Sequence, residues 1–277
     1  MSVLVRYCNL LAAWVVVLHL LGRGSASGDA LSASMAAIGS AGFFLSGRVL
    51  AALDRWWTQR RRDRRAEAVL HLLLSAPDDA EPPPFAVYLR PFSVTGRLMV
   101  SNRRLRGLPF MPRYYAHEAE MEFERVLAAA LPPDLPLLAL GRPGEAIGAG
   151  RIAVPDEVWK PMFQRLIEQA RWIVMIPSDQ GETRWEVQQL VAQRRLGKTI
   201  FIMPPSLKRG PIDLPDYWAR VRRGLAPDGV SLPAYTPAGQ VFRLGRGGRF
   251  YRSRYLRRLG VAPLRDSLAG ISSARPD

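Results

Sequence analysis

The stretch RWIVMIPSDQGETRWEVQQLVAQRRLGKTIFIM, residues 171–203, contains the pattern from which the fold class follows. It begins and ends with short runs that are apolar throughout, at residues 173–176 and 200–203. Uninterrupted apolar runs of this length are typical of strands buried on both faces of a parallel sheet. Residues 183–196 between them have the length and pattern of a helix. The stretch therefore predicts a strand, a crossover helix and a second, parallel strand.

The same alternation continues on both sides of this stretch. The other predicted elements are a strand at 85–90, a helix at 118–131, a strand at 137–140, a helix at 155–170, a helix at 217–225 and a strand at 240–244. Strands that alternate with helices predict an α/β domain in which helices cover both faces of a parallel sheet. The tail from Gly245 is basic and rich in glycine, and we expect it to be loosely ordered.

The composition limits the chemistry that the chain can carry. A length of 277 residues fits one ordinary domain plus an additional segment. Cys8 is the only cysteine, so the chain can form no internal disulfide and no cysteine-based metal site. The three histidines are isolated in the sequence, and we predict no metal site. The formal net charge is +15 and comes almost entirely from arginine, which partly reflects an arginine-rich codon background.

Two uncharged segments near the N-terminus predict a membrane anchor. They cover residues 7–21 and 30–47, and the second continues as an apolar run at 49–53. A short polar connection at 22–29 contains the turn-forming residues that a helical hairpin needs. We therefore expect two transmembrane helices within residues 1–54. The alternative is a cleaved signal peptide, because Arg6, an apolar stretch and small residues at 25–27 match its three regions.

The residues after the second apolar segment predict the orientation of the chain. Positive charge next to a span is retained on the cytoplasmic side, and anionic headgroups attract it. We therefore expect a multi-pass protein of the inner (plasma) membrane. The C-terminal domain is expected in the cytoplasm under either reading of the first segment. The residues expected at the membrane surface are Trp56, Trp57, Arg60, Arg61, Arg62, Arg64 and Arg65.

The sequence divides into four parts. They are a two-helix anchor at 1–54, a basic juxtamembrane helix with a proline-rich linker at 55–84, an α/β domain at 85–205, and a C-terminal helix, strand and basic tail at 206–277. Zinc-finger spacing, RNP-type aromatic motifs and basic-region heptads are absent from the sequence, which argues against a nucleic-acid partner. An adaptor that binds lipid or nucleic acid through its arginine clusters at 103–106 and 220–223 remains a third class of function.

Four local motifs, in this order, resemble a Toll/interleukin-1 receptor (TIR) domain. They are Leu89-Arg90-Pro91-Phe92, GRPGEAI at 141–147, RWIVMIPS at 171–178 and GETRWEVQQL at 181–190. The resemblance covers about residues 85–205 and implies a flavodoxin-like sheet, self-association and a role in signalling. The ligand-contacting residues that it implies are Arg90, Phe92, Arg142, Gly144, Ser178 and Trp185. In any other doubly wound domain, Arg142 and Gly144 would form a turn and Trp185 would belong to the core.

The sequence departs from the family at the catalytic position. Counted from Trp185, the glutamate of the NAD-cleaving members falls on Gln189, which cannot carry the charge that steadies an oxocarbenium-like centre. Only Glu186 could replace it, and an acid there can equally serve the N-terminal end of the helix. We therefore expect a membrane-tethered signalling or interaction domain without a required cofactor. The alternative is an enzyme that cleaves NAD or another nucleotide with Glu186 as its acid.

Overall fold

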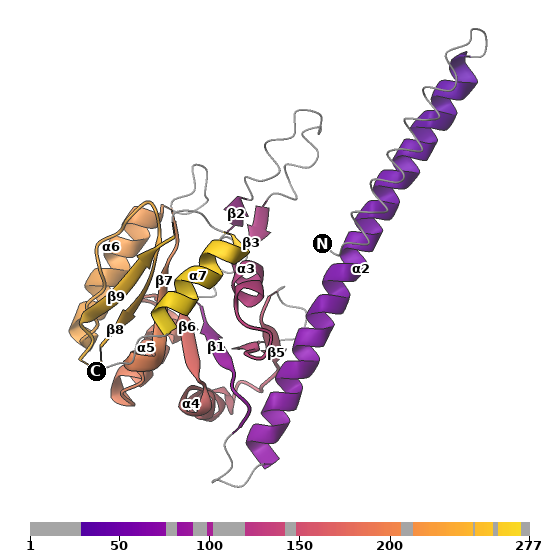
Figure 1. Ribbon diagram of the computed structural model, residues 1–277. Helices are drawn as coiled ribbons and strands as arrows, with labels where there is room; N and C mark the ends of the chain where they lie inside the picture. Colours follow the sequence, from indigo (N-terminus) through magenta and orange to yellow (C-terminus); the bar gives the residue numbers. More distant parts are fainter. Residues whose placement is uncertain are drawn as a thin grey trace. The chain divides into compact units, whose positions relative to one another are not determined.

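The computed structural model describes residues 29–75, 82–90, 99–101, 120–141, 148–205, 213–245, 247–256 and 260–272. The chain forms two compact units, Met1–Arg60 and Arg61–Asp277. The second unit holds the α/β domain (Figure 1). The first predicted span at 7–21 lies outside the described residues, as do Phe92, Arg142 and Gly144.

A single helix, α2, covers Asp29–Ser75 and is 47 residues long. The boundary that we expected near residue 54 falls inside this helix, which continues through the juxtamembrane residues. The reason is local, because no proline interrupts residues 29–75 and Pro77 follows directly after the helix. Within the described part of the chain, none of the helices combines the length and apolar character needed to cross a membrane.

The α/β domain is built on a seven-stranded sheet with the order β5-β4-β1-β6-β7-β8-β9. The strands are β1 Ala86–Leu89, β4 Leu137–Leu140, β5 Gly150–Ile152, β6 Trp172–Met175, β7 Thr199–Met203, β8 Gln240–Leu244 and β9 Phe250–Tyr255. Two further strands, β2 Met99–Ser101 and β3 Glu120–Glu122, form a separate antiparallel pair. The helices of the domain are α3 Phe123–Ala130, α4 Trp159–Gln169, α5 Gly181–Ala192, α6 Leu214–Leu225 and α7 Val261–Ser272, with 3-10 turns η4 Leu196–Lys198 and η5 Ala226–Asp228.

The sheet is mixed, which corrects the prediction of a parallel sheet. The five strands from β5 to β7 are parallel, whereas β8 pairs antiparallel with β7 and β9 antiparallel with β8. The chain between α6 and β8 explains the change of direction. Tyr235 donates its hydroxyl hydrogen bond to the carbonyl of Pro204, and Gly239 packs against Pro205, so β8 begins beside the end of β7. A strand that begins there must run back along β7.

The tail beyond Gly245 is another correction, because it forms β9 and α7 instead of a loose segment. Leu264, Leu268 and Ile271 are buried and recur at helical spacing, so α7 presents an apolar stripe to the domain. That stripe packs on α3 and on the last two strands. The high arginine content of this region concealed the pattern.

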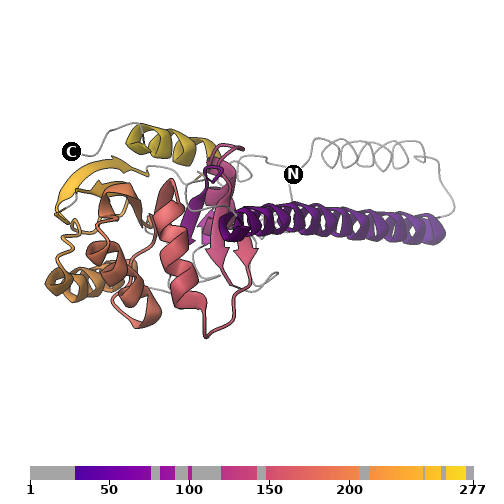
Figure 2. The same cartoon turned by 90° about the horizontal axis from the view of Figure 1, so that it is seen from below.

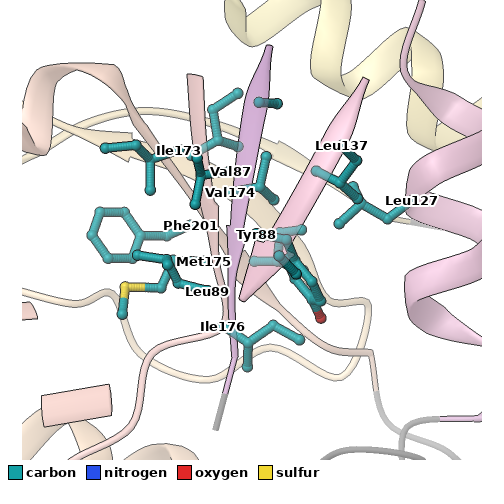
Figure 3. Close-up of a cluster of buried hydrophobic side chains, with 14 of the residues drawn as sticks. Val87, Tyr88, Leu89, Leu127, Leu137, Ile173, Val174, Met175, Ile176 and Phe201 are labelled. Atoms are coloured by element: carbon teal, nitrogen blue, oxygen red, sulfur yellow. The ribbon is translucent and has the colours of Figure 1, made fainter. Parts of the chain in front are cut away.

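Helices cover both faces of the sheet (Figure 2). Neighbouring residues of β8 show this directly, because successive side chains on a strand point to opposite faces. Phe242 packs edge to face on Trp218 of α6, whereas Arg243 donates a hydrogen bond to the carbonyl of Ile271 in α7. Between these layers, the side chains of β1, β6 and β7 form the centre of the core (Figure 3).

Residues 61–75 of α2 belong to the α/β unit and close one edge of its sheet. Asp63 accepts a hydrogen bond from the backbone N–H of Arg151 in β5, with 2.9 Å between the two atoms. Ala66, Val69 and Leu73 are buried on one face of the helix. Gly150 permits this approach, because a Cβ atom there would lie 2.8 Å from the Cβ of Ala66 and closer still to the carbonyl oxygen of Arg62.

We predict that Gly150→Ala lowers the free energy of unfolding of the full chain by about 1–3 kcal/mol, because α2 must move away from β5. The matched control is Gly247→Ala, where nothing lies within 4 Å of the added Cβ atom. Chemical denaturation of the two variants and of the parent chain measures the effect. Equal stabilities for the two variants would show that α2 does not pack on β5 in this way.

Candidate functional site

The candidate site lies at the C-terminal ends of the central strands. The chain passes from β1 to β4 on one side and later places β6 on the other side of β1. Open α/β sheets bind their ligands outside the carboxyl ends of the strands, at such a reversal of strand order. Arg90 follows β1 at this end, Ser178 follows β6, and α5 begins three residues further on at Gly181.

Arg90 is one of two arginines that hold a buried carboxylate. Its Nη1 lies 2.6 Å from Oε2 of Glu124, in the first turn of α3, and the Nη2 of Arg151 lies 2.7 Å from Oε1. The backbone N–H of Ala149 donates a further hydrogen bond to Oε1, at 2.9 Å. The side chains of Glu124 and Arg151 are only 2% and 0% exposed. Removal of one partner would leave an uncompensated buried charge, so this cluster is a structural centre.

Arg62 of α2 contacts the loop beside the same cluster, at Gly148. Arg62 donates a hydrogen bond from Nη1 to the carbonyl of Gly148, at 2.8 Å. Burial lowers the pKa of Arg62, and the nearby charge of Arg125 lowers it further. An added Cβ atom at Gly148 would collide with the side chain of Glu124. Of the arginines predicted at the membrane surface, Arg62 is thus turned toward the domain, whereas Arg60, Arg61, Arg64 and Arg65 are exposed.

Sequence reasoning missed Glu124 and Arg151. They are 27 residues apart in the chain, and neither belongs to a recognisable motif. Arg151 lies in a strand of three residues, too short to show a pattern of its own. Its Nε and Nη1 atoms are buried and meet no hydrogen-bond partner among the residues that the structure describes.

Glu186 is the most perturbed acid of the described chain. The residue is partly exposed, but its Oε2 is buried without a hydrogen-bond partner in the described ranges. Burial raises its pKa from 4.5 to about 8, and the negative charge of Glu182, one helical turn earlier, contributes to the rise. Glu186 is therefore protonated and neutral at pH 7. Perturbed acids of this kind are more frequent at functional sites than elsewhere.

Trp185 packs within the protein beside Glu186. Its ring centroid lies 5.0 Å from that of Trp159 and 5.3 Å from that of Phe163, both in α4. The ammonium group of Lys160 lies 5.2 Å from the Trp185 ring centroid, within cation–π range. Gln189, at the position where the resemblance places a catalytic glutamate, accepts a hydrogen bond from Gln164 of α4 at 3.2 Å. This face of α5 therefore forms a helix-to-helix contact.

Ser178 is also engaged locally. Its hydroxyl is buried and accepts a hydrogen bond from the backbone N–H of Gln180, at 3.2 Å, which shapes the turn before α5. Tyr217 of α6 donates to the carbonyl of Pro177 at 2.9 Å and keeps this turn against the helix layer. The structure thus gives Arg90, Ser178 and Trp185 partners within the protein. Within the described ranges, three or more potential metal ligands do not come together anywhere.

No protein-family model, curated protein or solved structure matches this chain. The resemblance to TIR domains accordingly rests on the sequence motifs alone. The site geometry adds two observations, a buried ion cluster at Glu124 and a neutral buried acid at Glu186.

We predict that Glu186 makes the folded domain less stable as the pH rises. Its pKa is higher in the folded state, so its contribution is fully retained below about pH 4.5 and lost as the pH rises through 8. Glu186→Gln cannot ionise. Its free energy of unfolding, relative to the parent, should therefore rise by about 1.4 kcal/mol for each pH unit between roughly 5 and 8.

Chemical denaturation at a series of pH values measures this difference. The exposed Glu157→Gln is the matched control and should follow the parent chain at every pH. If Glu186→Gln also runs parallel to the parent, then the carboxyl group is not buried in the folded protein.

Proposed function

We propose that this chain is a membrane-tethered protein whose α/β domain acts as a TIR-like signalling or interaction module on the cytoplasmic side. The observation that carries the proposal is α2, which joins an uncharged segment at 30–47 to the arginine-rich run at 60–65 and to the domain edge at β5. A helix in which an uncharged segment is followed by arginines and then by a folded domain suits a protein that presents this domain at an anionic membrane surface.

The dimensions of α2 support this proposal. A helix rises about 1.5 Å per residue, so residues 30–53 extend over roughly 36 Å, enough for a hydrocarbon core of about 30 Å. Trp56 and Trp57 are exposed directly after this stretch, as residues at a headgroup layer should be. Arg60, Arg61, Arg64 and Arg65 are exposed in the next two turns. The order of these residues along the chain fits a helix whose uncharged part is followed by aromatic and then basic residues at a membrane surface.

The strand order supports the TIR-like part of the proposal. The central strands follow the order β4-β1-β6-β7 and are parallel, which is the flavodoxin-like pattern that the resemblance implies. The mixed sheet, with β8 and β9 antiparallel, departs from it. Proteins with many unrelated functions have this strand order, so the order supports the proposed fold more than the proposed activity.

The environment of α5 favours binding over catalysis. Gln189 is neutral and bonded to Gln164, and Trp185 is packed against α4. Burial raises the pKa of Glu186 to about 8, which favours its neutral form at pH 7 and weakens its ability to stabilise a developing positive charge on a ribosyl group. Trp185 and Gln189 thus serve the contact between α4 and α5.

NAD or nucleotide cleavage remains the second candidate, and Glu186 is the specific observation in its favour. Its unpartnered, buried Oε2 costs stability, and such strain is often retained at functional sites. Because the chemistry needs a carboxylate, turnover by this route would rise as the pH passes through about 8.

We predict that the full chain remains with the membrane after washes with high salt and alkaline carbonate, because residues 30–53 are buried in lipid. A reporter fused after Asp277 should be active only in the cytoplasm. A control fusion after Asp29, ahead of the second uncharged segment, should report the opposite side. Release of the chain by carbonate, or a C-terminal reporter active outside the cytoplasm, would contradict the proposal.

We predict that the purified full chain in detergent micelles cleaves NAD slowly or not at all at pH 7, because Glu186 is neutral and Gln189 replaces the expected acid. Product formation over the pH range 6–9 is the measurement, with Glu186→Gln and Glu157→Gln as test and control variants. Robust turnover that rises through pH 8 and disappears only in Glu186→Gln would promote the enzymatic alternative.

A further inference from the structure

The two edges of the seven-stranded sheet differ. At β5, Asp63 of α2 accepts the hydrogen bond of an edge N–H, and the helix packs against Gly150. At β9, the strand pairs with β8 on one side, and its outer side pairs with no strand in the described part of the chain. Every second residue of an edge strand directs its N–H and C=O groups outward, so β9 can accept another strand.

Most side chains of β9 are exposed, although α7 packs on one face of the strand and the guanidinium group of Arg254 lies against Gly270 there. Its sequence is Phe250-Tyr251-Arg252-Ser253-Arg254-Tyr255, and only Ser253 is half-buried. Phe250 is 46% exposed and Tyr255 is 58% exposed. Residues 229–265 contain no acidic residue, and arginines recur from Arg243 onward. Positive charge on an edge strand disfavours pairing with a strand of like charge, and it leaves the edge open to a strand of opposite charge.

We propose that β9 is the docking edge for an extended, acidic segment of a partner protein, which adds to the sheet as an eighth strand. Backbone hydrogen bonds to β9 would hold the segment, and its alternate side chains would face those of β9. Acidic residues would then lie opposite Arg252 and Arg254, with apolar residues opposite Tyr251 and Tyr255, at the distances that favour cross-strand pairs.

A second copy of this chain fits the edge poorly. Arg252 and Arg254 share one face of β9, because residues two apart on a strand point the same way. Pairing of two β9 strands in a register that aligns their faces would therefore place arginine opposite arginine, which is destabilising. An acidic segment removes this repulsion, so charge complementarity selects a different partner.

The test uses the full chain in detergent micelles and a labelled peptide of the same length as β9, with glutamate and valine in alternation. Fluorescence anisotropy should show saturable binding. The double variant Arg252→Glu/Arg254→Glu should weaken it by about tenfold or more, since two attractive pairs become repulsive. Arg222→Glu/Arg223→Glu, with the same charge change on the exposed end of α6, is the matched control and should bind like the parent.

N-methylated peptides separate strand addition from simple charge attraction. Methylation of every second amide blocks one edge of the peptide, and methylation of the other amides blocks the opposite edge. Strand addition predicts that one of these two peptides binds and the other fails. Equal binding of both, equal losses in the β9 and α6 variants, or binding of oligothymidylate but not of the acidic peptide would each overturn the proposal. Thermal unfolding of both charge variants confirms that they are folded.

Discussion

The contact on which the domain depends is the buried carboxylate of Glu124 between the guanidinium groups of Arg90 and Arg151. It joins the end of β1, the start of α3 and the strand β5 in one cluster. Such a cluster is costly to bury, but it becomes strongly stabilising relative to a state in which one partner is missing. Asp63 and Arg62 extend the same polar contact to α2. Residues 61–75 of α2 are therefore held on the sheet by hydrogen bonds as well as by apolar packing.

A second group of polar contacts, at the antiparallel end of the sheet, involves Arg243 of β8. Arg243 is buried in β8, donates hydrogen bonds to the carbonyls of Gly197 and Ile271, and lies 4.9 Å from the ring centroid of Trp172. Burial lowers its pKa. It joins η4, α7 and the central strands where the antiparallel strands begin. The Arg243 centre thus lies where the sheet changes from parallel to antiparallel pairing, whereas the Glu124 centre lies at the parallel edge strand β5.

The sequence predicted the elements whose pattern is strong. The apolar runs of β1, β4, β6 and β7 were located to within a residue or two, because strands buried on both faces leave a continuous signal. The strand β5 was missed because three residues are too few to show the alternation of apolar and polar side chains that marks a strand. The strand β9 was missed because its exposed arginines and tyrosines resemble the composition of a loop. The direction of β8 was missed because the contacts of Tyr235 and Gly239 that reverse the chain are tertiary. For the candidate site, sequence reasoning identified Arg90 and Glu186. It predicted neither the ion pair of Arg90 with Glu124 nor the burial of the Glu186 carboxyl group, because both depend on the packed structure.

The short strand β5 has a consequence for how the domain folds. The backbone of Arg151 is bonded to Asp63, 88 residues earlier in the chain, and its side chain to Glu124, 27 residues earlier. A strand of three residues gains too little from local contacts to form before these partners arrive. Loop-closure entropy must be lost first, so this edge of the sheet belongs to the slow, non-local part of folding. We therefore expect the completion of β5 and the docking of residues 61–75 to be cooperative, because Asp63 supplies a hydrogen-bond partner that β5 lacks by itself.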